Sequence, residues 1–216
     1  MILAINTALK EHELALIEGD DILGQEIWRG SRDDVDQLVP KLSSMLNELG
    51  LNKKEITDIV VVNGPGPYTA VRMGVSFANG LAEGLGAKLH QLSSFELLTH
   101  KVGTTDPVLA VVFGGGLNVA VYHDGSFKQG ALSSLLAEYS HDDYKVISEL
   151  NETLSTELHS ICLEKRWKEI EGHEQQSMAE VLLTAGLELC TPVDLVAEQY
   201  LRAPKITPSN NPWKKA

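Results

Sequence analysis

The order of the predicted strands and helices limits the possible folds of this chain more than any other feature. Apolar and alternating segments followed by a helical pattern occur twice, each time as three strands, a helix and a strand. In the first half we predict strands at 2–7, 13–18 and 22–28, a helix at 31–49, a strand at 59–62, a helix at 68–86, a strand at 88–92 and a short helix at 95–100. In the second half we predict strands at 108–113, 117–122 and 127–132, a helix at 133–139, a strand at 144–147, and helices at 153–170 and 177–189.

Two β-β-β-α-β units in tandem are the plan of the actin/hexokinase/Hsp70-like (ASKHA) α/β fold, in which two lobes share a topology. We therefore predict a first lobe at residues 1–103 and a second, reduced and divergent lobe at 104–203. Residues 204–216 contain three prolines and two adjacent asparagines. This composition predicts a flexible tail.

Composition excludes several classes of protein. The net charge of −12 over 216 residues argues against direct, strong binding to nucleic acid. No apolar run reaches 18 residues, so we expect no membrane span. The first residues lack a basic segment and resemble a strand, not a signal peptide. Cys162 and Cys190 lie far apart without metal-ligand spacing, which favours reduced thiols in a cytoplasmic protein.

The helix predicted at 31–49 has one apolar face and clear signals at both ends. Ser31 precedes Asp34 by three residues, the spacing of a capping box, and Gly50 is suited to end the helix. Pro40 lies inside the apolar pattern, so we expect a kink that costs roughly 3 kcal/mol.

Segment 63–74 reads Asn-Gly-Pro-Gly-Pro-Tyr-Thr-Ala-Val-Arg-Met-Gly and joins a buried strand to a helix. Its glycines supply backbone freedom, its prolines stiffen the turn, and Thr69 is a candidate helix cap. The first N–H groups of such a helix lack intrahelical acceptors and suit an anion or a docking partner. A tight connection with nothing bound explains the segment equally well.

The helix predicted at 68–86 carries an unusual load of small residues. Gly74, Ala78 and Ala82 recur at four-residue spacing, and Gly80 and Gly84 lie beside them. Because each glycine costs about 1 kcal/mol in a helix interior, this load needs a packing reason. We expect a second helix, or the helices of a partner, to lie against this row, although packing on the chain's own sheet explains part of it.

Candidate catalytic groups are few. Asn6 stands where kinases of this fold carry an aspartate, and a neutral amide is neither a general base nor a strong Mg²⁺ ligand. The Gly114-Gly115-Gly116 turn is a phosphate-binding candidate, but tight hairpins use glycine more often for steric reasons. The sequence contains no P-loop, HExxH or Gly-x-Ser-x-Gly motif. Ser93 and Ser94 fit a helix cap better than a nucleophile, and Arg72 suits an anion, an interfacial carboxylate or solvent equally.

Segment 63–74 resembles the GPGSFTGLRIG signature of the TsaB (YeaZ) family. The matches are Gly64, Pro65, Gly66, Thr69, Arg72 and Gly74, with Tyr68 in place of Phe. Segments 36–40, 93–97 and 198–202 are similar to further elements of that family, the last to its Tyr-Leu-Arg close. Phe113-Gly114-Gly115-Gly116 replaces the usual Asp-Ala-Arg turn. The resemblance is therefore strong over 1–100, weak over 105–190 and local at 198–202.

The resemblance implies a non-catalytic subunit that supports formation of threonylcarbamoyladenosine at position 37 of tRNA. Its partners would be a TsaD homologue in a heterodimer and the ATPase TsaE in a ternary complex, with a homodimer possible for the free chain. ATP and metal are expected on those partners and no cofactor on this chain, and tRNA would be held mainly by the partner.

Members of this family contact TsaD through two helices of the first lobe. The expected interface residues here are Val35, Leu38, Val39, Leu42, Tyr68, Thr69, Arg72, Met73, Gly74, Phe77, Ala78, Leu81 and Ala82. Two other functions stay open at this point. One is a small stand-alone kinase or ATPase of the same fold, and the other is a peptidase, for which the metal-ligand spacing is missing.

Overall fold

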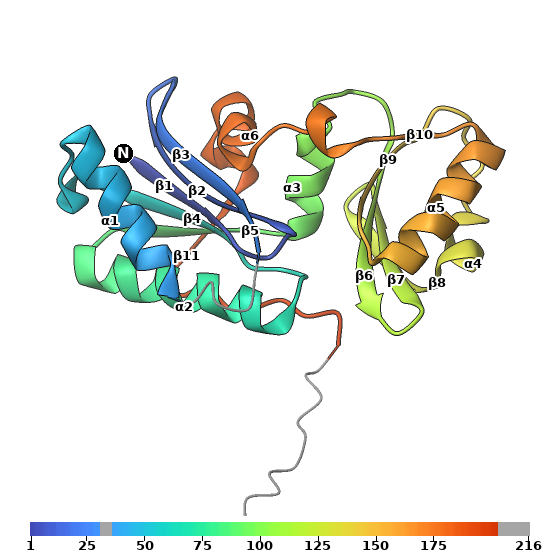
Figure 1. Ribbon diagram of the computed structural model, residues 1–216, viewed down its shortest axis with the longest axis horizontal. Coiled ribbons are helices and arrows are strands. Elements are labelled where there is room, and N and C mark those ends of the chain that lie inside the picture. Colours follow the sequence, from blue (N-terminus) through green and yellow to red (C-terminus); the bar gives the residue numbers. More distant parts are fainter. Residues whose placement is uncertain (31–35, 203–216) are drawn as a thin grey trace, which may run out of the picture.

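The computed structural model describes residues 1–30 and 36–202, which build two mixed β-sheets with helices around them (Figure 1). The first sheet has the order β11-β5-β4-β1-β2-β3, and the second β10-β9-β6-β7-β8. The strands of the first are β1 Ile2–Asn6, β2 Glu11–Glu18, β3 Asp21–Arg29, β4 Asp58–Val62, β5 Lys88–Leu92 and β11 Thr191–Val193. Those of the second are β6 Val108–Gly115, β7 Asn118–His123, β8 Ser126–Ala131, β9 Lys145–Glu149 and β10 Lys168–Glu169.

The two sheets repeat one topology. In the first, β1, β2 and β3 form an antiparallel meander, β4 runs parallel to β1, and β5 runs parallel to β4. In the second, β6, β7 and β8 form the meander, and β9 and β10 continue in parallel. This duplication confirms the predicted two-lobe α/β fold.

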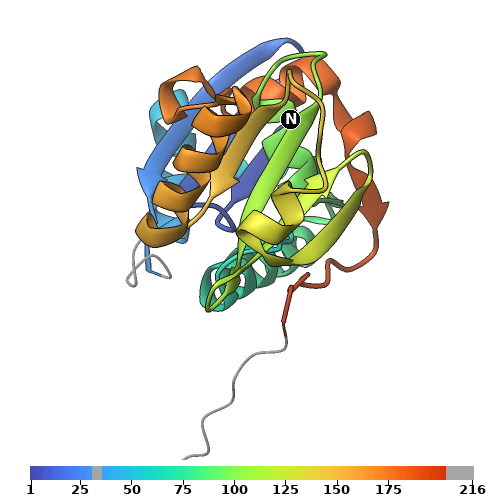
Figure 2. The ribbon, with the colours of Figure 1, turned by 90° about the vertical axis from the view of Figure 1, so that its right-hand side faces the viewer.

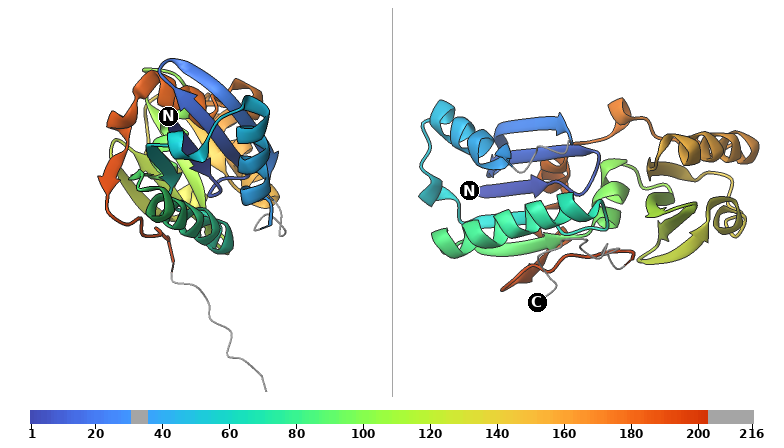
Figure 3. Two further views of the ribbon diagram at one scale, coloured as in Figure 1. Left: turned by 90° about the vertical axis from the view of Figure 1, so that its left-hand side faces the viewer. Right: turned by 60° about the horizontal axis from the view of Figure 1, so that its bottom comes forward.

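Helices cover both faces of the first sheet and the outer face of the second. The helices are α1 Leu38–Leu49, α2 Tyr68–Leu85, α3 Ser94–Lys101, α4 Leu132–Leu136, α5 Glu152–Lys165 and α6 Met178–Ala185. Short 3₁₀ turns lie at Lys53–Glu55, Gly172–Glu174 and Leu187–Leu189. Helices α1 and α2 lie side by side on one face of the first sheet (Figure 3), and α4 and α5 lie in front of the second (Figure 2).

Helix α1 begins later than predicted, and this changes the role of Pro40. The helix starts at Leu38, so Pro40 lies in its first turn, where an N–H has no intrahelical acceptor to lose. The predicted kink is therefore wrong. The predicted end is confirmed, because Gly50 follows the helix with φ of 66°. The Ser31–Asp34 capping box and Val35 lie outside the described residues.

The last part of the described chain returns to the first sheet. Residues 178–202, predicted as part of the second lobe, pack there because β11 pairs with β5 and α6 packs on β2 (Figure 1). Helix α6 starts on a buried carboxylate: Glu13 accepts hydrogen bonds from the backbone N–H groups of Met178 (2.8 Å) and Ala179 (2.9 Å). The predicted helices at 153–170 and 177–189 end earlier, at Lys165 and Ala185.

The two lobes share a packed core. The larger cluster of buried side chains fills the first lobe and includes Ala110, Val112, Ala120 and Ile147 from the facing side of the second sheet. Helix α3 lies between the sheets and contacts β6 and β9. A second cluster lies under α4 and α5. Within 1–30 and 36–202, no helix has the length and apolar character to cross a bilayer.

Candidate functional site

The Gly/Pro loop between β4 and α2 is packed against the chain itself. A Cβ on Gly64 would overlap the carbonyl oxygen of Gln199, and one on Gly66 would overlap that of Ala8. Gly64 also has φ of 109°, which side chains rarely tolerate. These glycines are therefore needed for close backbone packing. The prediction that Thr69 caps α2 is wrong. The N-cap is Pro67, and no side chain caps the helix.

The inward face of α2 carries the row of small residues that was predicted to meet a partner. Ala78 is fully buried and Ala82 is 4% exposed. The side chain of Thr7 occupies the space that a Cβ on Gly74 would need, and its hydroxyl donates to the carbonyl of Ala70 (2.7 Å). The row faces the first lobe's own sheet, so it is not available for a close helix crossing with another chain.

The outward face of α2 has a small-residue row of its own. Ser76, Gly80 and Gly84 are exposed at four-residue spacing. A Cβ on Gly80 or Gly84 would meet no atom within 4 Å. Each glycine costs about 1 kcal/mol relative to alanine, and the described fold gains no packing from either.

A groove of about 500 Å³ separates the outward faces of α1 and α2. Val39 on α1 is 58% exposed and Tyr68 on α2 is 39% exposed. The lining residues are Leu38, Val39, Tyr68, Thr69, Arg72, Met73, Ser76 and Phe77. The structure thus brings together seven of the expected interface residues, Leu38, Val39, Tyr68, Thr69, Arg72, Met73 and Phe77. Leu81 is half-buried, whereas Leu42, Gly74, Ala78 and Ala82 point inward.

Residues 196–202, which include the family-like segment 198–202, contact α2 and the Gly/Pro loop before it. The side-chain amide of Asn79 donates to the carbonyl of Val196 (2.9 Å) and accepts from its N–H (3.0 Å). Farther along, the N–H of Gln199 donates to the carbonyl of Asn63 (2.7 Å). Segments 63–74 and 198–202, far apart in sequence, therefore form one structural unit. No local sequence pattern predicts these contacts of Asn79, which join the two segments.

Aromatic and charged side chains close this unit at the start of α2. The rings of Tyr68 and Tyr200 lie 4.8 Å apart. The guanidinium of Arg72 donates to the hydroxyl of Tyr68 (3.2 Å) and lies 3.9 Å from the carboxylate of Glu198. Burial, with a smaller contribution from Glu198, raises the pKa of Tyr200 to about 12. Arg72 is half-exposed, so its charge can still meet a carboxylate from outside.

Asn6 and Glu149 end strands β1 and β9 and lie close to each other at the junction of the two lobes. Asn6 is fully buried, and its side-chain oxygen accepts from the N–H groups of Ala8 (3.1 Å) and Leu9 (3.3 Å). Its amide donates to the carbonyl of Glu11 (3.0 Å), so Asn6 holds the β1–β2 turn. The N–H of Lys10 in that turn donates to Glu149 at the end of β9 (3.1 Å). Burial raises the pKa of Glu149.

The other candidate groups have structural roles. Gly115 and Gly116 have φ of 93° and 66°, so the β6–β7 turn requires glycine. Ser93 is the N-cap of α3 in a capping box with Glu96. Both cysteines are buried, free thiols whose pKa burial raises to about 12. Among the described residues, no three His, Cys, Asp or Glu side chains gather into a metal site.

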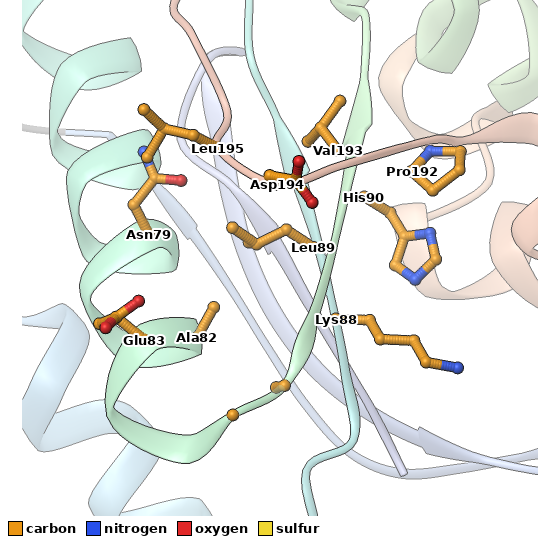
Figure 4. Close-up of a pocket in the computed structure, with 12 residues that line it drawn as sticks. Asn79, Ala82, Glu83, Lys88, Leu89, His90, Pro192, Val193, Asp194 and Leu195 are labelled. Atoms are coloured by element: carbon orange, nitrogen blue, oxygen red, sulfur yellow. The ribbon is translucent and has the colours of Figure 1, made fainter.

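A larger cavity, of about 880 Å³, lies at the far end of α2 against β5 and the segment after β11 (Figure 4). Asn79 and Glu83 of α2 line one side of it and Leu89 and His90 of β5 another, and Leu195 lies beside Asn79. Its His90 is engaged, because its ring nitrogen lies 2.9 Å from the carboxylate of Asp58. Burial raises the pKa of Asp58, but hydrogen bonds from His90 and Thr57 outweigh it and hold the pKa below its usual value.

Comparison with known proteins identifies the family. The model of the TsaD family, described as tRNA N6-adenosine threonylcarbamoyltransferase, matches residues 29–181. The chain belongs to this family. Its TsaB (YeaZ) character is also confirmed, because it is 29% identical over 140 residues to the tRNA threonylcarbamoyladenosine biosynthesis protein TsaB of Bacillus subtilis. That alignment covers 63% of this chain and 60% of the relative. The transferase of Pyrobaculum neutrophilum is 31% identical over 91 residues, which are 40% of this chain and 27% of the enzyme.

Solved structures show the same fold. YeaZ from Pseudomonas aeruginosa superposes with a TM-score of 0.67 at 17% identity, covering 86% of this chain and 90% of that one. A protein described as similar to peptidase YEAZ, from the same organism, superposes with a TM-score of 0.72 at 17% identity, covering 93% and 99%. Both likenesses confirm the fold predicted from the duplicated element order.

Proposed function

We propose that this chain is a cytoplasmic, non-catalytic partner subunit in the formation of threonylcarbamoyladenosine in tRNA. Its main partner would be a TsaD-type transferase, with a TsaE-type ATPase joining the pair. The observation that carries the proposal is the open groove between α1 and α2, with Val39 and Tyr68 exposed. Farther along α2, Gly80 and Gly84 are exposed as well. Membership in the family supports the assignment to threonylcarbamoyladenosine formation.

The groove supports contact with helices of a partner. Apolar side chains line a shallow channel along two helices that lie side by side, a geometry that accepts the ridges of a facing helix pair. The two exposed glycines leave room for a close helix backbone. Arg72 at the rim offers a charge to a partner carboxylate.

The contacts of Asn6 and Glu149 support a non-catalytic role. The side chain of Asn6 is fully engaged in holding the β1–β2 turn, and the carboxylate of Glu149 accepts from the N–H of Lys10 in that turn. ATP and metal would therefore be bound by the partners. Because this chain has a net charge of −12, we expect the partner to bind the tRNA.

Calorimetric titration of the purified chain with a TsaD homologue from the same organism tests the proposal. Val39→Glu places a charge in the groove and should weaken the complex at least about tenfold, which corresponds to about 1.4 kcal/mol. Leu163→Glu is a matched control, because Leu163 is 68% exposed on α5, far from the groove in sequence and on the second lobe. Equal affinity of the two variants would place the interface elsewhere, and absence of binding by the unmodified chain would refute the proposal.

A further inference from the structure

Residues 196–200, called the strap from here on, run along α2 from its second half to its first turn (Figure 3). Each of these five residues contacts α2 or the Gly/Pro loop before it. The contacts are Val196 with Asn79, Ala197 and Gln199 with Asn63, Glu198 with Arg72, and Tyr200 with Tyr68. The strap therefore links the second half of the helix to the side chains that line the start of the groove.

Asn79 holds the strap at the end that is far from the groove. Its side-chain amide donates to the carbonyl of Val196 (2.9 Å) and accepts from the N–H of the same residue (3.0 Å). One side chain thus satisfies both backbone groups of Val196, which requires a donor and an acceptor on one planar group. Val196 is 2% exposed, so water has little access to these groups if the amide is removed.

At the groove end, the strap contacts two side chains that have little packing of their own. Tyr68 is 39% exposed, and the side chain of Arg72 is 57% exposed. The ring of Tyr200 lies against that of Tyr68, and the carboxylate of Glu198 lies beside the guanidinium of Arg72. Fixing a long, exposed side chain in one conformation costs conformational entropy. Contact with the strap lowers that cost before a partner binds.

We propose that Asn79 is a positioning residue for the α1–α2 groove. By holding Val196 it fixes the strap, and the strap orients Tyr68 and Arg72 in the conformation that a partner meets. Asn79 lines the cavity at the far end of α2 instead of the groove, so its effect on a partner passes through the strap. The consequence for affinity rests on the proposed function, whereas the orientation of the two side chains does not depend on it.

Amide hydrogen exchange of the whole chain tests the positioning without a partner. In Asn79→Ala, the amide of Gln199, which donates to Asn63, should exchange roughly tenfold faster, and the NMR signals of the Tyr68 ring should shift. Amides of β4 should keep their rates, which separates release of the strap from a loss of overall stability. Glu83→Ala is the matched control, because Glu83 lies one turn farther along α2 and lines the same cavity, and its carboxylate makes no hydrogen bond or ion pair with the described residues.

Affinity for a TsaD homologue, measured by calorimetry, tests the consequence for a partner. Asn79→Ala should weaken binding about three- to tenfold, the range expected when one or two interface side chains lose their ordering. The pair Glu198→Ala and Tyr200→Ala removes the contacts of the strap with the groove side chains. Adding Asn79→Ala to this pair should cause no further loss, because Asn79 acts only through the strap. Asn79→Gln, whose amide is one methylene too far from the helix to hold both groups of Val196, is a milder second variant with the same expected pattern.

Three results would overturn the proposal. Unchanged exchange of Gln199 and unchanged signals of Tyr68 in Asn79→Ala would show that the strap is held without Asn79. Undiminished affinity of a variant whose strap is released would show that the strap does not prepare the groove for a partner. A further loss when Asn79→Ala is added to the pair would show that Asn79 acts by another route. Absence of binding by the unmodified chain would instead refute the proposed function, and the exchange measurement would still decide whether Asn79 holds the strap.

Discussion

The two faces of α2 carry similar residues for different reasons. On the inward face, Gly74 leaves space for the Thr7 side chain, and Ala78 and Ala82 let the helix lie close to the sheet. On the outward face, Gly80 and Gly84 leave space that no described atom fills. Small residues in a row thus report a close neighbour, but they do not say whether that neighbour belongs to the same chain. Burial shows that the neighbour of the inward row is the chain's own sheet, whereas the outward row has no neighbour among the described residues.

The largest effect is expected on the inward face. Ala78→Leu forces three extra carbons between α2 and the sheet and should lower the free energy of unfolding by about 1–3 kcal/mol or more. Urea denaturation followed by circular dichroism measures the change. A variant as stable as the unmodified chain would show that a larger side chain fits between α2 and the sheet. The two faces of α2 would then not differ in packing.

On the outward face, Gly80→Leu should leave folding intact and weaken partner binding. The extra side chain enters open space, and leucine is a better helix former than glycine by roughly 1 kcal/mol. In a complex it should clash with a closely packed helix and weaken affinity by roughly one to two orders of magnitude. Calorimetry with the TsaD homologue measures this loss, and undiminished affinity would remove Gly80 from the interface.

Thr7→Val tests the polar part of the inward contact. Valine keeps the shape that fills the space at Gly74 but loses the hydroxyl that donates to Ala70. The expected loss is about 0.5–1.5 kcal/mol of unfolding free energy. Thr7→Ser keeps the hydroxyl but lacks the methyl group. It therefore separates the contribution of shape from that of the hydrogen bond. If valine is neutral, the inward face is held by shape alone.

The smallest effect is expected for Gly84→Ala. Alanine fits an exposed helix position without contact and should raise the unfolding free energy by up to about 1 kcal/mol. Thermal denaturation of the isolated chain measures the gain. Destabilisation instead would mean that the outward face is already covered in the free chain, by a second copy or by another segment.

The sequence predicted the fold well because its signals are local. Alternation and apolar runs located nine strands, and the Tyr68–Leu85 helix differs from its prediction by one residue. Strands β10 and β11 were missed, since segments of two and three residues carry no readable period. Pro40 was misread because the start of α1 depends on where the preceding chain runs, not on the apolar spacing.

The candidate site was predicted only in part, for a different reason. The two helices and seven of the eight residues that line the groove follow from the resemblance to the family, whereas Ser76 was not predicted. Which face of α2 is buried depends on Thr7, which lies 63 positions before Ala70. The pairing of Asn79 with Val196 spans 117 positions. The apolar spacing of a helix does not reveal contacts between residues so far apart in sequence. The row of Gly74, Ala78 and Ala82 was therefore expected, wrongly, to meet a partner.

The pairing of β11 with β5 has a consequence for the order of events during synthesis. The first sheet contains both the first strand of the chain and the last strand of the described part. The Gly/Pro loop and the start of α2 are likewise held by residues 197–200. Contacts between such distant segments form late, because a long loop must close before they contribute. A nascent first lobe therefore lacks its final strand, and its Gly/Pro loop lacks the contacts that residues 197–200 supply, until those residues have left the ribosome.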